Sequence, residues 1–217
     1  MLVANDWKDY EIIDASRGQK LERWKDVYLL RPDPQIVWDN GDLLEKYHSM
    51  INAVYYRSNK GGGHWENLRS TPGTWNVNYK DLTFNIKQMG FKHTGLFPEQ
   101  AVNWDIMSNK IKNAGREIRV LNLFAYTGGA TVACLKAGAH VTHVDSSRGM
   151  IDWCKENEIA EKINMAIENE FPNLPEEEVY FKRYEGLKFF VFKNFESMSV
   201  PFLEHVIDEI YDSLFED

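Results

Sequence analysis

Residues 119–145 read RVLNLFAYTGGATVACLKAGAHVTHVD, and this stretch decides the fold. Its first part, 119–125, is a nearly continuous apolar run of strand length, as expected for a strand covered on both faces. The glycine pair at 128–129 ends the run, and small and apolar residues with helical spacing follow over 130–136. A second strand is predicted over 140–145, with an acidic residue at its end. The stretch is therefore predicted to form a βαβ unit.

The turn and the acid of this unit are suited to a nucleoside ligand. Gly128 and Gly129 lack Cβ atoms, so a ligand can lie against the backbone, and the free N–H groups of the next helix favour polar or anionic atoms. Asp145 follows Gly128 by 17 residues and is placed to accept both hydrogen bonds of a ribose diol. Nicotinamide dinucleotides and S-adenosylmethionine both satisfy this spacing. The dinucleotide fingerprint G-x-G-x-x-G is absent, since position 131 is Thr, and this favours S-adenosylmethionine. A glycine turn that binds no nucleotide is the plain structural alternative.

Length and composition narrow the class of protein. The chain has 217 residues, of which 43% are hydrophobic and 27% charged, typical values for a globular α/β protein. Its apolar stretches span only a few residues, so no membrane-spanning helix is predicted, and the first ten residues lack the pattern of a secretory signal. We therefore expect a cytoplasmic protein. Cys134 and Cys154 are interpreted as reduced packing residues, and no metal site is predicted.

The charge of the chain changes at Asn157. Residues 1–157 contain 20 basic and 18 acidic side chains, whereas residues 158–217 contain 5 and 15. All seven tryptophans, and every glycine except Gly186, also precede this point. Such a joint shift predicts a domain boundary. A single domain whose last helices are acidic is the alternative.

The flanking segments have distinct patterns. The first 90 residues contain many turn signals between alternating runs such as 75–79 and 82–86, which predict strands with one buried face. Helical spacing follows over about 100–111, with Gly115 as a C-cap. The last 60 residues read as a small α-β-β-α tail whose final helix is amphipathic.

Several of these motifs together resemble one family. They are LNLFAYTGGAT at 121–131, AGA at 137–139, VDSS at 144–147, and, upstream, the segments 20–24, 31–35, 57–65 and 91–100. The chain resembles class I S-adenosylmethionine-dependent methyltransferases, and within them the bacterial 23S rRNA cytosine-methyltransferase-like family, over about residues 6–157. The resemblance implies a β-hairpin-rich N-terminal extension (1–90) and a partial Rossmann-like S-adenosylmethionine-binding domain (91–157). The acidic α-β-β-α tail (158–217) lies outside the resemblance.

The resemblance also implies a cofactor, a substrate class and a set of binding residues. Motif residues Phe124, Ala125, Tyr126, Thr127 and Gly128 would line the methionine and ribose parts of S-adenosylmethionine. Asp145 would hold the ribose hydroxyls with Ser146 beside it, and Phe97, Glu99 and Gln100 would close the pocket. The implied acceptor is RNA, specifically a base of rRNA.

The sequence departs from the family after residue 157. The family's Asp-Pro-Pro-Tyr motif, which holds the acceptor base, is absent: none of the later prolines, Pro172, Pro175 and Pro201, follows an Asp. Sixty residues are also too few for the remaining βα units, so no catalytic residue is assigned. Two hypotheses follow. The protein is an RNA methyltransferase, or it is a catalytically inactive, truncated or fused cofactor-binding or interaction protein. The second would form a homo-oligomer through its open sheet edge or its tail.

The basic, glycine-rich segment near residue 60 has two possible roles. Arg57, Lys60, His64 and Arg69 lie close in sequence to Trp65. They would contact RNA phosphates and stack on bases, or they would form an ordinary charged hairpin loop over core tryptophans.

Overall fold

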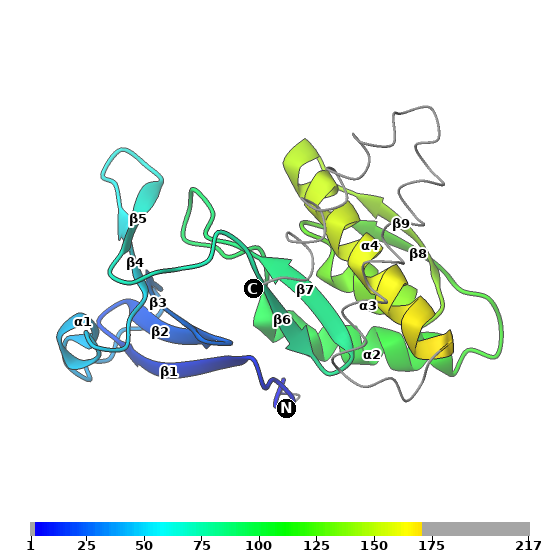
Figure 1. Cartoon of the computed structure of the whole chain (residues 1–217), viewed down its shortest axis with the longest axis horizontal. Helices are drawn as coiled ribbons and strands as arrows, with labels where there is room; N and C mark the ends of the chain where they lie inside the picture. Colours follow the sequence, from blue (N-terminus) through cyan, green and yellow to red (C-terminus); the bar gives the residue numbers. More distant parts are fainter. Residues whose placement is uncertain (1–2, 171–217) are drawn as a thin grey trace. The chain divides into compact units, whose positions relative to one another are not determined.

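The structure is a computed structural model that describes residues 3–170 (Figure 1). The chain divides into two compact units, Met1–Val102 and Asn103–Asp217, and each is considered separately below. The strands and final helix predicted beyond residue 170 lie outside the described residues. The domain division at 90 and 157 stays a prediction.

The first unit is built around a five-stranded sheet in the order β1-β2-β3-β4-β5. The strands are β1 (Tyr10–Ser16), β2 (Gln19–Trp24), β3 (Val27–Pro32), β4 (Ala53–Arg57) and β5 (Gly63–Asn67). Neighbours pair antiparallel except β3 and β4, which are parallel because the connection containing α1 (Leu43–Lys46) returns the chain to the same end of the sheet. The predicted β-rich N-terminal part is therefore confirmed.

A separate hairpin of β6 (Trp75–Tyr79) and β7 (Leu82–Ile86) completes the strands of this unit. Its bounds are those predicted from the alternating pattern. Trp75, Val77 and Tyr79 are buried while Asn78 is exposed, so one face of the hairpin packs inward, as the period of two requires.

The core of the five-stranded sheet contains a buried ion pair among its apolar side chains. Leu21, Leu30 and Val54 pack together, with Leu43 and Ile51 from the α1 connection. On the adjacent strands β2 and β3, the Glu22 carboxylate and Arg31 guanidinium are both buried and share two hydrogen bonds. Glu22 also accepts a hydrogen bond from Tyr10 Oη at 2.6 Å and lies 3.0 Å from Lys20 Nζ, and Arg31 Nη1 donates to Lys92 O at 3.0 Å. The buried pair therefore has partners for both charges, and it fixes how β2 and β3 pack.

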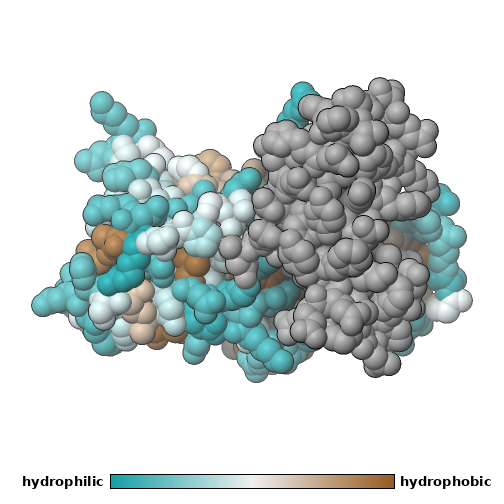
Figure 2. Space-filling view, viewed as in Figure 1, coloured by the Kyte–Doolittle hydropathy of each residue, from teal (hydrophilic) through white to brown (hydrophobic). Residues whose placement is uncertain are grey.

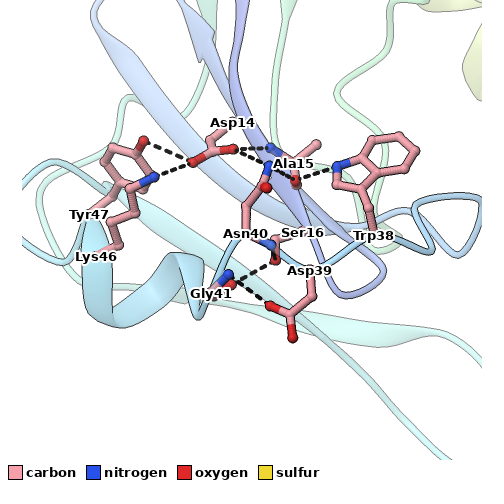
Figure 3. A network of polar contacts seen from close by, with 9 residues as sticks. All are labelled: Asp14, Ala15, Ser16, Trp38, Asp39, Asn40, Gly41, Lys46 and Tyr47. Carbon is pink, nitrogen blue, oxygen red and sulfur yellow. Dashed lines mark hydrogen bonds and ion pairs between the residues drawn. The ribbon is translucent and has the colours of Figure 1, made fainter.

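A polar network ties α1 to the first strand (Figure 3). The register of β1 against β2 shifts between Ile12 and Asp14. At this irregularity the Asp14 carboxylate accepts hydrogen bonds from Ala15 N at 2.8 Å, Lys46 Nζ at 2.7 Å and Tyr47 Oη at 2.9 Å. These donors, Lys46 first, lower the pKa of Asp14 to about 2. The network therefore needs the ionised carboxylate.

The second unit contains the predicted βαβ unit. β8 (Arg119–Leu123) and β9 (His140–Val144) form a parallel pair, and α3 (Gly129–Lys136) connects them. Upstream, a short 3₁₀ turn at Pro98–Gln100 leads into α2 (Ala101–Lys112), which confirms the helix predicted there. Together with the β-rich first unit, this gives the α/β architecture with a partial Rossmann-like sheet.

Helix α4 (Arg148–Glu170) follows β9 and packs with α3. It runs through the composition break at Asn157, so the helix expected from about residue 158 is the second half of α4.

One expectation for β8 was wrong. The apolar run was interpreted as a strand covered on both faces, but Leu121 is 62% exposed and Leu123 53% exposed. Alternate residues of a strand point to opposite faces, and α3 packs against the two strands from one side. Within residues 3–170, no element therefore covers the face of the sheet that carries Leu121 and Leu123.

The coloured part of Figure 2 is largely hydrophilic, with small and separate hydrophobic patches. Over residues 3–170, no helix combines the length and the apolar character that crossing a bilayer requires.

Candidate functional site

The turn between β8 and α3 has an unusual backbone. Phe124, Tyr126 and Gly128 have positive φ angles of 52°, 54° and 91°. Non-glycine residues seldom adopt this left-handed region, and such residues concentrate at ligand-binding turns. The turn is closed by hydrogen bonds from Ala125 N to Val144 O and from Gly128 N to Ala125 O, both 3.1 Å long. The first of these joins the turn to the end of β9.

Asp145 binds this turn through its side chain. Its Oδ2 accepts a hydrogen bond from Tyr126 N at 2.9 Å, and its Oδ1 accepts one from Ser147 N at 2.8 Å. The backbone N–H groups of Ser147 and Tyr126 lower the pKa of Asp145, so the group is a carboxylate at neutral pH. The backbone donors, which include Ser146 N–H, use part of the carboxylate's roughly four acceptor sites, and the remainder can accept from the hydroxyls of a diol.

Helix α4 packs against the same turn. A Cβ on Gly128 would overlap Cys154 Sγ and lie 3.1 Å from Cys154 Cβ, so only glycine fits at this close approach. Asn157, one turn further along α4, is buried, and its Nδ2 donates to Thr127 O at 2.9 Å. Both contacts hold the turn against a rigid helix.

A polar cluster extends from this support into the sheet. Thr131 Oγ1 lies 2.9 Å from His143 Nδ1 and accepts a hydrogen bond from Asn122 Nδ2, also at 2.9 Å. Cys154 Sγ lies 3.2 Å from the same His143 nitrogen and 3.3 Å from Glu158 Oε1. The cluster links β8, α3, β9 and α4, so all four elements fix the position of the turn.

The structure divides the residues named from the resemblance between the two units. Phe124, Ala125, Tyr126, Thr127, Gly128, Asp145 and Ser146 gather at the ends of β8 and β9 in the second unit, whereas Phe97, Glu99 and Gln100 lie at the 3₁₀ turn of the first unit. The assignment of all ten residues to the cofactor stays a prediction.

Their side chains differ in what they offer a ligand. Phe124 is 94% exposed and Ser146 is exposed, while Ala125 and Thr127 are buried. The latter two therefore offer a ligand their backbone rather than their side chains.

Sequence reasoning missed two supporting residues. Cys154 was interpreted as a reduced packing residue. The structure buries Cys154 and Cys134, and within residues 3–170 neither forms a disulfide. Neither the contact of Cys154 with Gly128 nor the Asn157 hydrogen bond was anticipated. Their spacing of three indicates a shared helix face. It does not indicate what that face contacts. In the described ranges, no group of three or more His, Cys, Asp or Glu side chains is arranged to hold a metal ion.

Comparison with known proteins identifies the class. Residues 53–167, which contain the turn, Asp145 and most of α4, match the family described as S-adenosylmethionine-dependent methyltransferase. The chain is similar to a solved S-adenosylmethionine-dependent methyltransferase from Agrobacterium tumefaciens, with 34% identity and a TM-score of 0.67. The match covers 72% of this chain and 50% of that one. The chain therefore belongs to the S-adenosylmethionine-dependent methyltransferase family.

Curated relatives give a more particular similarity. The chain is 31% identical over 106 residues to ribosomal RNA large subunit methyltransferase K/L of Colwellia psychrerythraea, a match that covers 48% of this chain and 14% of that protein. It is 41% identical over 75 residues to the protein of the same name from Shewanella frigidimarina, covering 34% and 10%. The chain thus matches about a seventh or less of the length of these relatives.

These similarities bear on the alternatives. They favour a methyltransferase over both the nicotinamide-dependent reading and the inactive interaction protein. Neither they nor the described residues support the homo-oligomer that the open sheet edge suggested.

Proposed function

We propose that this protein binds S-adenosylmethionine at the β8–α3 turn and transfers its methyl group to a base of ribosomal RNA. One observation carries the cofactor part of the proposal: the Asp145 carboxylate is bonded to Tyr126 N and retains acceptors for a ribose diol. This arrangement places the acid and the glycine turn beside one another, as a nucleoside requires. The family resemblance supports Phe97, Glu99 and Gln100 as further cofactor-binding residues.

The role of the chain in such a reaction is mainly positional. The cofactor supplies an activated methyl on a sulfonium sulfur. When bound, it would give this methyl to an acceptor atom of the base: the carbon–sulfur bond would break as the new bond forms, the methylated base would release a proton, and S-adenosylhomocysteine would remain. The turn, held by Asn157 and Cys154, fixes the donor, and a fixed donor lowers the entropic part of the barrier. The described residues assign no group that holds the acceptor base.

The RNA part of the proposal is supported by the relatives named as ribosomal RNA large subunit methyltransferases. An rRNA substrate would place the protein in the cytoplasm, where ribosomes are assembled in bacteria.

Calorimetric titration with S-adenosylhomocysteine tests the cofactor site. We expect a micromolar dissociation constant, equivalent to about −8 kcal/mol. Asp145→Asn keeps one oxygen for the turn but removes the charge and one acceptor, so we expect affinity to fall by at least about 10-fold. Asp152→Asn is the matched control, because this carboxylate is exposed and, within residues 3–170, pairs with Arg148 and Lys155 at the surface. A folded wild-type protein that binds no S-adenosylhomocysteine would refute the cofactor site.

Methyl transfer is tested with radiolabelled S-adenosylmethionine and rRNA from cells that lack the protein. We expect label in the RNA of these cells and none in RNA that is already methylated. Cofactor binding without transfer to any rRNA would overturn the substrate assignment and restore the catalytically inactive alternative.

A further inference from the structure

Three aromatic rings follow one another on the segment before α2 in the first unit. Phe91 and His93 have ring centroids 6.5 Å apart at 69°, and His93 and Phe97 have centroids 5.2 Å apart at 56°. Phe91 is 52% exposed and Phe97 37% exposed. We call these three residues the aromatic row. Exposed rings that are neighbours in space leave π-faces available to a planar ligand.

The backbone that carries the row is fixed by hydrogen bonds. Met89 N donates to His93 O at 3.2 Å, and Lys87 N donates to Thr94 O at 3.1 Å. Two side chains from the five-stranded sheet also bond this segment: Trp65 Nε1 donates to Met89 O at 2.8 Å, and Arg31 Nη1 donates to Lys92 O at 3.0 Å. A ligand would therefore meet a surface that is already ordered, which reduces the entropic cost of binding.

Positive charge accumulates beside the row. Burial and the neighbouring cations Arg57, Arg31 and Lys20 lower the pKa of Lys92, against the opposing effect of Asp33. Burial and the cations Arg31, Lys92 and Lys20 likewise lower the pKa of His93 and keep its ring neutral at pH 7. Burial is the larger cause of the lowered Lys92 pKa and the neighbouring cations add to it, so an anion bound beside Lys92 would favour its charged form.

The acidic groups nearby are largely engaged. The buried Glu22 carboxylate accepts hydrogen bonds from Tyr10 Oη and Arg31 Nη2. Lys20 Nζ forms ion pairs with Glu22 at 3.0 Å and with Asp33 at 3.5 Å. Glu99 also lies close enough to act on the pKa of Arg31, and it is exposed.

Arg57, at the end of β4, lies close enough to Lys92 to contribute to the lowered pKa of its ammonium. Arg57 shares a strand face with Tyr55, whose partner across the hairpin is Trp65, and the Trp65 indole bonds the loop at Met89. Arg57 is exposed, and across residues 3–170 no carboxylate lies within ion-pair distance of it. Its guanidinium is therefore available to an anionic ligand.

We propose that the aromatic row, with Arg57 and Lys92, binds an unpaired segment of single-stranded RNA. A base stacks on Phe91 or His93, and the flanking phosphates bind Arg57 and Lys92. Aromatic rings beside cations suit this ligand, because every base has a π-face and every nucleotide carries a phosphate. The choice of RNA rests on the proposed function. The proposal deepens that function by naming residues that would bind an unpaired stretch of the RNA.

Fluorescence anisotropy with the full chain and a labelled 12-nucleotide oligouridylate tests the row. We expect Phe91→Ala to weaken binding about 10-fold, and Phe91→Leu to weaken it similarly because leucine retains bulk but no π-face. Phe91→Trp should retain affinity. Trp38→Ala is the matched control, since Trp38 is 51% exposed in the same unit. A 12-base-pair RNA duplex, which has no unpaired bases, should bind independently of residue 91.

The salt dependence of oligouridylate binding tests whether Arg57 contacts a phosphate. Arg57→Ala should weaken oligouridylate binding and reduce the slope of log K against log salt by about one. Arg119→Ala is the control for diffuse electrostatic attraction, because Arg119 has an 87% exposed side chain in the other unit. Equal effects of Arg57→Ala and Arg119→Ala would overturn the assignment of Arg57.

Titration of the same variants with S-adenosylhomocysteine separates this proposal from the proposed function. Suppose that wild type binds S-adenosylhomocysteine, and that Phe91→Ala weakens oligouridylate binding no more than Trp38→Ala does. The proposal for the aromatic row is then refuted, while the cofactor site stands. If oligouridylate binding depends on Phe91 while no S-adenosylhomocysteine binds, the cofactor site fails and the row stands. Wild-type protein that binds no oligouridylate at 50 mM salt refutes the row outright.

Discussion

Replacing Gly128 by alanine should destabilise the second unit through two separable effects. The first is backbone strain: at φ of 91° a Cβ costs about 1–2 kcal/mol. The second is overpacking, because the new methyl would overlap Cys154 Sγ and lie 3.1 Å from Cys154 Cβ, which costs about 1–3 kcal/mol. The free energy of unfolding should therefore fall by about 2–5 kcal/mol, a large share of typical domain stability.

The chain offers a matched control for the first effect. Gly138 also has a positive φ, 94°, but a Cβ there would meet nothing within 4 Å. Gly138→Ala should therefore cost only the backbone strain of about 1–2 kcal/mol. Urea denaturation followed by circular dichroism at 222 nm, with linear extrapolation at equal m-values, measures both variants.

A double-mutant cycle isolates the packing effect. Cys154→Ala removes Sγ, so Gly128→Ala should cost about 1–2 kcal/mol less in the Cys154→Ala background than in wild type. The close contact between the turn and α4 is refuted if Gly128→Ala destabilises no more than Gly138→Ala and the cycle shows no coupling.

Two further predictions concern the first unit. Glu22→Gln leaves the Arg31 guanidinium buried without a counter-charge, and we expect it to lower the free energy of unfolding by about 3–5 kcal/mol; urea denaturation would contradict this with a loss below about 1 kcal/mol. Asp14 has a pKa lowered to about 2 by Lys46 and its other donors, so its ionisation stabilises the fold above about pH 4 and this contribution is lost as pH falls through about 2. Asp14→Asn should therefore be less stable than wild type at pH 5, by about 1–2 kcal/mol after allowance for solvent screening, and the difference should narrow toward pH 2. A difference that is constant with pH would show that the Asp14 charge does not stabilise the network.

The elements around the candidate site were predictable because their signals are local. Alternation of large apolar residues predicted β6 and β7 at their observed bounds. The apolar run, the glycine pair and the second strand predicted the βαβ unit. A spacing of two or 3.6 residues between apolar side chains follows from the local backbone conformation. It can therefore be recognised without knowing how the rest of the chain packs.

The same local signals misled where burial was concerned. The apolar run of β8 suggested cover on both faces, yet Leu121 and Leu123 are exposed. An apolar sequence records which side chains favour burial. Which faces are covered depends on the elements that pack against the strand.

The sequence by itself therefore predicted the βαβ unit, the β6–β7 hairpin, the family resemblance and the candidate binding residues at the turn. Only the tertiary structure decided that Asp145 bonds Tyr126 N, that Cys154 and Asn157 hold the turn from α4, and that Arg57 accompanies the aromatic row. These contacts join residues distant in the chain, and their geometry is set by how whole elements pack. Local periodicity depends on residues that are near in the chain and gives no information on how the elements pack. A sequence can therefore indicate candidate site residues without showing which of them are in contact.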